Sequence, residues 1–303
     1  MIVRRTMLAG SLLGAPTLLS LRAGADDRDS ELRNRIADLE RRHGGRLGVA
    51  VLDTTAMKLF AYRGDELFPL CSTFKLLAAA FVLARVDHKQ ESLTRRVVYT
   101  KDYLVAYSPI TEKHVGESGL TVGEICEAAV TLSDNTAGNL LLDSFGGPTG
   151  LTAYLRSIGN GVTRLDRWET ELNEARPGDP RDTTTPVAML EILHRTVLGT
   201  ALSVTSRERL TGWLVANKTG DKRLRAGLPK GWRVGDKTGT GANNTMNDIA
   251  VIWSPEHAPI IVTAYYTGAR ASDDERNVVL SEVGRLCSGG VSRSHLDCVG
   301  IAG

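Results

Sequence analysis

Two residues able to perform covalent chemistry stand about one helical turn apart in the segment FPLCSTFKLLAAAFVL. Ser72 and Lys75 form the only S-x-x-K pattern in the chain. Three residues is nearly one turn, so both side chains lie on one helix face, close to an N-terminus with positive potential. An amine at that spacing can activate a serine hydroxyl as a nucleophile. Taken alone, the pair is also consistent with a helix cap followed by a surface lysine.

Two further short patterns carry hydroxyl, amide and amine groups. The triplet S-D-N at 133–135 links two predicted helices and by itself predicts a helix cap. The triplet K-T-G occurs twice, at 218–220 and at 237–239. The first follows a helix predicted to end near Ala216, where a glycine terminates a helix, whereas the second continues a β-type run. The second triplet is therefore the predicted functional one.

The elements that must position these residues can be predicted from periodicity. Leu32, Ile36 and Leu39 share one helical face, which predicts a first helix over 30–43. The runs RLGVAVLD and KLFAY predict an antiparallel hairpin. Thr185 before Pro186 is typical of an N-cap and N1 pair. The middle of the chain is predicted to be mostly helical, over 72–86, 120–132, 135–145, 149–158, 186–198 and 206–216.

The β-type pattern returns near the C-terminus in WRVGDKTGT, DIAVIW and IIVTAYY, before a last helix over 273–286. We therefore expect an α+β fold, with an antiparallel five-stranded sheet built from both chain ends, flanked by helices, and an inserted all-helical block. The expected domains are a discontinuous sheet domain, 26–65 with 221–303, and a helical domain, 66–220. The polar segment 159–185 is too long for a routine connection, which favours a functional loop.

The first 25 residues have the pattern of a cleaved export signal. Arg4 and Arg5 give a basic start, an apolar run from Met7 to Leu21 follows, and small residues stand at 23 and 25. The run is shorter than the roughly 20 residues that span a bilayer. Because Arg4 and Arg5 are adjacent, the twin-arginine route is as open as the ordinary one. We expect a periplasmic protein.

Composition and charge exclude several classes of protein. The 303 residues are 42% hydrophobic and 24% charged, as in an ordinary folded chain. Removal of the signal takes away three arginines and no acid, so the formal charge falls from +2 to −1. A nearly neutral protein gives no electrostatic reason to bind nucleic acid. The six histidines lack metal-ligand spacing and no G-x-x-x-x-G-K loop occurs, so no metal or cofactor is expected.

Four cysteines allow three pairings if all of them oxidise after export. Cys126 falls at helical spacing with apolar neighbours, which favours a packed core thiol. Cys287 and Cys298 could bridge the C-terminal tail.

S-x-x-K, S-D-N and K-T-G, in that order, resemble the motif set of class A β-lactamases and penicillin-binding proteins. The segment RWETELN at 167–173 resembles the class A E-x-x-L-N segment, with Asp182 matching the acid that closes the Ω-type loop 167–182 against Arg167. YSPITEKH, from Tyr107, resembles a rim segment of the same family. The similarity runs from about residue 30 to about 287. The chain is identified as a member of the class A serine β-lactamases.

The resemblance implies a role for each motif residue in ring opening. Ser72 attacks the lactam carbonyl, Lys75 stands close enough to take a proton, and Ser133 relays one to the departing nitrogen. The oxyanion lies against the backbone N–H groups of Ser72 and Thr240. Glu169 and Asn173 hold and activate the water that hydrolyses the acyl-enzyme. Whether Lys75 or Glu169 is the base for acylation stays open.

The same resemblance implies substrate-binding residues and a spectrum. These residues are Asn135, Tyr107, Lys237, Thr238, Thr240 and Arg223. The last four of them suit the carboxylate that these antibiotics carry. A bridge to Cys126 is absent, since its partner position is Ala79. The bridge from Cys71 found in carbapenem-hydrolysing members is also absent, since its partner position is Gly241. The implied partners are small β-lactams, chiefly penicillins and cephalosporins, acted on by a monomer without membrane contact.

Two related classes share the three motifs. A DD-peptidase of cell-wall synthesis deacylates slowly, and Glu169 with Asn173 argues against it. A penicillin-sensing receptor domain would need a spanning helix after the motifs, and the sequence has none there.

Overall fold

The computed structural model describes residues 17–116, 119–255 and 257–292. The twin-arginine pair and Cys298 lie outside these residues. Among the described helices, none combines the length and the apolar character that crossing a bilayer requires.

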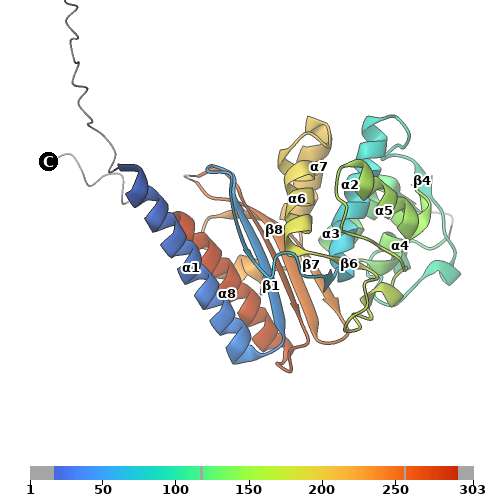
Figure 1. The fold of residues 1–303 in the computed structure, drawn as a ribbon. Helices are drawn as coiled ribbons and strands as arrows, with labels where there is room; N and C mark the ends of the chain where they lie inside the picture. Colours follow the sequence, from blue (N-terminus) through green and yellow to red (C-terminus); the bar gives the residue numbers. More distant parts are fainter. Residues whose placement is uncertain (1–16, 117–118, 256, 293–303) are drawn as a thin grey trace, which may run out of the picture.

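A five-stranded antiparallel sheet forms the centre of the molecule (Figure 1). Its order is β2-β1-β9-β8-β7, so the strand nearest the N-terminus, β1, pairs along its whole length with the last strand, β9. The predicted sheet built from both chain ends is thereby confirmed. The strands are β1 Arg46–Asp53, β2 Lys58–Tyr62, β7 Arg233–Gly241, β8 Thr245–Trp253 and β9 Ile260–Thr267.

Helices α1 (Thr17–His43) and α8 (Asp273–Ser292) lie side by side over one face of this sheet (Figure 1). Both are longer than predicted, since α1 begins before residue 30 and α8 continues past 286. Ile36 and Leu39 of α1 and Val283 of α8 are buried in one apolar cluster with the sheet. The spacing of these apolar residues explains why the two helices could be predicted although their outer ends could not.

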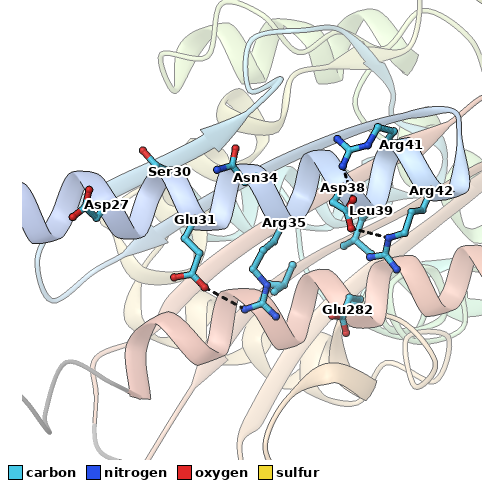
Figure 2. A pocket seen from close by; sticks show the side chains of 11 residues that line it. Asp27, Ser30, Glu31, Asn34, Arg35, Asp38, Leu39, Arg41, Arg42 and Glu282 are labelled. Carbon is cyan, nitrogen blue, oxygen red and sulfur yellow. Dashed lines mark hydrogen bonds and ion pairs between the residues drawn. The ribbon is translucent and has the colours of Figure 1, made fainter.

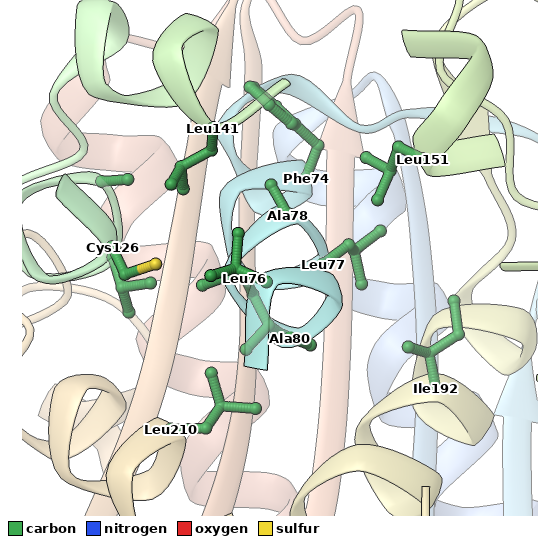
Figure 3. Packing of buried hydrophobic residues seen from close by; sticks show 14 of the residues in the cluster. Phe74, Leu76, Leu77, Ala78, Ala80, Cys126, Leu141, Leu151, Ile192 and Leu210 are labelled. Atoms are coloured by element: carbon green, nitrogen blue, oxygen red, sulfur yellow. The ribbon is translucent and has the colours of Figure 1, made fainter. Parts of the chain in front are cut away.

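The other face of the sheet carries the helical block, centred on α2 (Phe74–Asp87). Leu76, Leu77, Ala78 and Ala80 point to different sides of α2 and are all essentially unexposed. Figure 3 shows them packed against side chains of the surrounding helices. A helix that is apolar all round belongs inside a protein. The surrounding helices are α3 Val122–Thr131, α4 Asn135–Asp143, α5 Gly147–Ser157, α6 Pro186–Leu193 and α7 Val204–Val215.

Short elements account for the differences from the predicted helix limits. The segment predicted to begin a helix at 120 first pairs with β4 (Arg96–Val97) as β5 (Leu120–Thr121). Thr121 then caps α3 in a capping box with Glu124. The helix α6 ends at Leu193, and a π turn, η5, follows. The remaining short elements are β3 Phe68–Pro69, β6 Thr183–Thr184, η1 Cys71–Thr73, η2 Lys101–Tyr103, η3 Thr111–Lys113, η4 Glu171–Asn173, η5 His194–Leu198 and η6 Leu224–Gly227.

Candidate active site

Ser72 lies in the single turn η1, just before α2 begins at Phe74. It is therefore not the N-cap of the α-helix, the alternative reading of the S-x-x-K pattern. Cys71 before it adopts a left-handed φ of 46°, an uncommon conformation that recurs at functional sites. The Lys75 Nζ atom lies 2.8 Å from Ser72 Oγ. The two motif residues thus meet as the helical spacing predicted.

The ammonium group of Lys75 is the centre of a buried polar cluster. It donates to Asn135 Oδ1 at 2.7 Å and to the Ser133 carbonyl oxygen at 3.1 Å. It also forms an ion pair with Glu169 Oε1 at 2.6 Å, and neither side chain is exposed. Burial lowers the pKa of Lys75 from its ordinary value, although the Glu169 carboxylate opposes that shift. A proton can therefore leave this amine more easily than an exposed one.

Glu169 is held in place by its own loop and by α4. Its backbone N–H donates to Asn139 Oδ1 at 2.9 Å, and the Asn139 amide donates back to the Glu169 carbonyl at 3.1 Å. Asn173 donates to Glu169 Oε2, so the carboxylate is bound at both oxygens. The role of Asn139 was missed by sequence reasoning. Its only sequence signal is its position one turn after Asn135 on α4.

The loop that carries Glu169 is closed at its base by buried charges. Asp182 is 1% exposed and accepts from the Arg167 Nε atom at 2.6 Å and from two backbone N–H groups, of Asp166 and Arg167. Arg167 also pairs with Glu174. These contacts bring the two ends of the long polar segment together, as the resemblance implied. Apolar packing adds to these contacts, since Leu165 and Leu172 of the segment are buried in the main core cluster.

Ser133 faces the same cluster from the turn between α3 and α4. Its backbone is left-handed, with φ of 59°, which directs the turn back toward α2. Asp134 next to it is fully buried and caps α4 through Ala137. The same carboxylate accepts from the backbone N–H groups of Ile110 and Thr111. The predicted helix cap is therefore correct for Asp134. Its neighbours Ser133 and Asn135 instead accept hydrogen bonds from Lys75.

The second K-T-G triplet lies on β7, at the edge of the sheet. Lys237 is fully buried and donates to Ser133 Oγ at 3.0 Å. Burial, reinforced by the charges of Lys75 and Arg223, holds its pKa well below the ordinary value. The three motifs, from α2, the α3–α4 turn and β7, thus converge on one point.

Arg223 reaches this strand from the loop before η6. Its guanidinium donates to the carbonyl oxygens of Gly239, at 2.8 Å, and Asn247, at 2.6 Å, and to Thr240 Oγ1 at 2.7 Å. Because the Thr240 oxygen accepts from arginine, its own hydrogen is left to donate to a ligand. Arg223 places positive charge directly behind Thr240.

A cavity of about 360 Å³ collects most of the predicted residues. Lys75, Glu169 and Lys237 lie buried behind its wall, while Tyr107 stands at the rim with 61% of its surface exposed. Thr219 of the first K-T-G triplet also lines this cavity, against the prediction that this triplet only ends a helix. The lining residues are Ser72, Tyr107, Ser133, Asn135, Asn173, Thr219, Arg223, Thr238, Gly239 and Thr240.

Cys71, Cys126 and Cys287 are all buried free thiols. Burial raises the pKa of Cys71, so its thiol is a packing group rather than a nucleophile. A Cβ atom placed on Gly241 would lie 2.7 Å from Cys71 Sγ and 2.8 Å from the Asn173 carbonyl oxygen. A side chain at 241 would therefore require the strand or the loop to shift, because the K-T-G strand passes closely under the loop. The predicted bridge to Cys298 lies outside the described residues.

Another cavity, of about 630 Å³, opens between α1 and α8 and is lined mainly by charged side chains (Figure 2). Asp38 pairs there with Arg42 at 2.8 Å and with Arg41, and Glu31 pairs with Arg35 at 3.8 Å. None of the motif residues reaches it.

The fold and the site together define a serine hydrolase that works by acyl transfer, with a lysine beside the nucleophile and a buried carboxylate opposite it. The model of the beta-lactamase enzyme family matches residues 31–290. Beta-lactamase OXY-1 of Klebsiella oxytoca is 46% identical over 291 residues, covering 95% of this chain and 98% of the relative. Beta-lactamase Toho-1 of Escherichia coli is 44% identical, with 95% and 98% covered.

Solved structures agree. An ancestral class A β-lactamase is 66% identical with a TM-score of 0.84, covering 86% of this chain and 99% of its own. A putative class A β-lactamase, PenP, from Rhodopseudomonas palustris is 60% identical with a TM-score of 0.85, covering 86% of this chain and 99% of its own. The chain belongs to the beta-lactamase enzyme family and is a class A serine β-lactamase.

Proposed function

We propose that this β-lactamase hydrolyses penicillins and cephalosporins through an ester on Ser72. The observation that carries the proposal is the ion pair between Lys75 and Glu169, fully buried and in contact with the serine. A cell-wall DD-peptidase needs the lysine but not a carboxylate bound to it. The pair favours an enzyme in which both acylation and deacylation are fast.

In acylation, Ser72 Oγ bonds to the lactam carbonyl carbon and loses its proton to the Lys75–Glu169 pair. Both groups are within reach, since Oγ lies 2.8 Å from the amine and 3.4 Å from Glu169 Oε1. Which of them is the acylation base stays open. The carbonyl oxygen becomes negative and takes hydrogen bonds from the backbone N–H groups of Ser72 and Thr240.

Ring opening breaks the carbon–nitrogen bond, and the nitrogen needs a proton. Ser133 supplies it, and is itself reprotonated from the lysines on either side. Lys237 donates to Ser133 Oγ at 3.0 Å, while the Lys75 amine lies 3.5 Å from the same oxygen. The lowered pKa of both lysines makes that transfer less costly.

Deacylation adds water to the ester carbon and returns the proton to Ser72. Glu169 removes a proton from the water molecule, and Asn173 holds that water molecule in place. The Asn173 Oδ1 atom is buried and lacks a hydrogen-bond partner among the described residues, so it is available to accept from water. Asn135 fixes Lys75 and, with Tyr107 at the rim, contacts the substrate.

The antibiotic carboxylate binds at Lys237, Thr238, Thr240 and Arg223. Thr240 and the open position at Gly241 favour cephalosporins beside penicillins as substrates. Steady-state kinetics on both classes test this spectrum, and the unbridged Cys71 leads us to expect poor carbapenem turnover.

We also propose that residues 26–65 and 221–303 form one domain and 66–220 the other, with the site between them. The contributions of Ser72 and Ser133 from one part and Lys237 from the other support this division. We further propose removal of residues 1–25 on export to the periplasm, where the mature protein acts as a monomer.

A chromogenic cephalosporin tests the mechanism. Residues 26–303 should turn over many equivalents, Ser72→Ala should be inactive, and Glu169→Ala should accumulate an acyl-enzyme visible in the intact mass. Glu171→Ala is the matched control, because this acid is exposed in the same loop. A single stoichiometric burst from the parent protein would overturn the proposal in favour of a peptidase or a receptor.

A further inference from the structure

The first K-T-G triplet is a structural part of the substrate site. Lys218 donates its backbone N–H to the Thr131 carbonyl at 2.9 Å, which ties the triplet to the end of α3. A Cβ atom on Gly220 would overlap the Asp236 carboxylate, so the glycine permits close contact with β7. Thr219, between them, lines the cavity. The two triplets therefore lie against each other although 19 positions separate them.

The Thr219 hydroxyl connects the two triplets. It donates to Asn217 Oδ1 at 2.8 Å, and it is in hydrogen-bond contact with Thr238 Oγ1. Asn217 is 2% exposed and Thr238 is 4% exposed, while Thr219 between them is half-buried at the cavity wall. An amide oxygen can only accept. In one arrangement the Thr219 hydrogen points to Asn217, and the Thr238 hydrogen then points to Thr219.

In that arrangement Thr238 has no hydrogen to offer a substrate. A carboxylate can only accept, so binding requires the Thr238 hydrogen to turn toward the ligand. The Thr219 hydrogen can then turn to Thr238 Oγ1. Asn217 Oδ1 remains satisfied, since the Thr219 backbone N–H also donates to it, at 3.1 Å. In both arrangements, therefore, Asn217 Oδ1 and the two threonine hydroxyls keep a hydrogen-bond partner.

We propose that Thr219 is a positioning residue for the substrate carboxylate, through this reversible pair of hydroxyls. The inference rests on the proposed function and deepens it. Thr219 keeps the Thr238 oxygen bonded in both states, so that turning the hydroxyl toward the carboxylate leaves no buried group unpaired. The expected contribution is that of one hydrogen bond, about threefold to tenfold in KM.

Thr219→Val tests the proposal because valine keeps the shape and removes only the hydroxyl. With a carboxylate-bearing chromogenic cephalosporin, KM should rise about threefold to tenfold while kcat stays within about twofold. Thr219→Ser should restore the wild-type KM. With the methyl ester of the same cephalosporin, wild type and Thr219→Val should have the same kcat/KM. The ester lacks the negative carboxylate to which the Thr238 hydroxyl donates.

The outcomes separate the inference from the proposed function. Equal losses on the acid and the ester, no rescue by serine, or an unchanged KM for Thr219→Val would overturn the inference while the wild type still turned over. Failure of the wild type to turn over either compound would instead overturn the proposed function. If thermal denaturation shows that valine unfolds the loop, Thr219→Ala gives the same readout without a second methyl group.

Discussion

Lys75 Nζ lies 2.6 Å from Glu169 Oε1, and both side chains are completely buried. They come from α2 and from the long loop, 94 residues apart in the chain. Opposite charges at this depth stabilise each other only while both are present. The pair therefore links the integrity of the loop to the catalytic lysine.

Lys75→Met should lower the free energy of unfolding by about 3 kcal/mol near pH 8, because it leaves Glu169 buried and unpaired. The double variant with Glu169→Gln should regain much of this loss. Urea denaturation of the four proteins in the cycle measures the coupling. Lys222→Met is the control, since the Lys222–Asp274 pair is exposed and should contribute less than about 1 kcal/mol. Strictly additive losses in the cycle would contradict the prediction.

Arg167→Ser should destabilise the loop by removing the bonds to Asp182 and Glu174. We expect a loss of about 1–3 kcal/mol, because the Asp182 carboxylate is buried and loses its charged donor. Slower deacylation should accompany it, as Glu169 loses its fixed position.

Arg181→Ser is the matched control for that variant. Arg181 pairs with Asp179 in the same loop, but nearly half of its side chain is exposed. Denaturation, together with amide exchange of residues 167–182, measures both variants. Equal effects of the two substitutions would show that general loop charge, rather than the closure by Arg167, is responsible.

The sequence predicted the order of elements because apolar spacing and caps are local signals. Thr185, predicted to cap the next helix, does accept from the Ala188 N–H at 3.1 Å. The S-x-x-K pair was predictable for the same reason, since both residues lie on one turn. Asn139 and Thr219 were missed because each contacts the site through a residue distant in the chain, Glu169 and Thr238 respectively. Periodicity does not indicate which loop passes beside which strand.

Asp236 and Asp248 form a buried acidic pair behind the K-T-G triplet, and this pair predicts a pH-dependent stability. Both side chains are fully buried, and within the described part of the chain Asp236 Oδ2 and Asp248 Oδ1 have no hydrogen-bond partner. Arg225 pairs with Asp236, whereas Asp248 accepts from the Leu224 N–H, at 3.1 Å. Burial, reinforced by the Asp236 carboxylate, raises the pKa of Asp248 well above its ordinary value. At pH values between the unfolded and the folded pKa, the folded protein therefore holds a proton on Asp248 that the unfolded chain has released.

A group with a raised folded pKa contributes stability below its unfolded pKa, and this contribution is lost as the pH rises through the folded value. Asp248→Asn mimics the protonated acid and does not titrate. Its stability relative to wild type should increase from about pH 4 upward, by about 1.4 kcal/mol for each unit by which the folded pKa exceeds the unfolded one. Urea denaturation from pH 4 to pH 9 measures this difference. Asp221→Asn, at an exposed acid nearby, should show a constant difference. A constant difference for Asp248→Asn as well would mean that Asp248 is ionised in the folded enzyme.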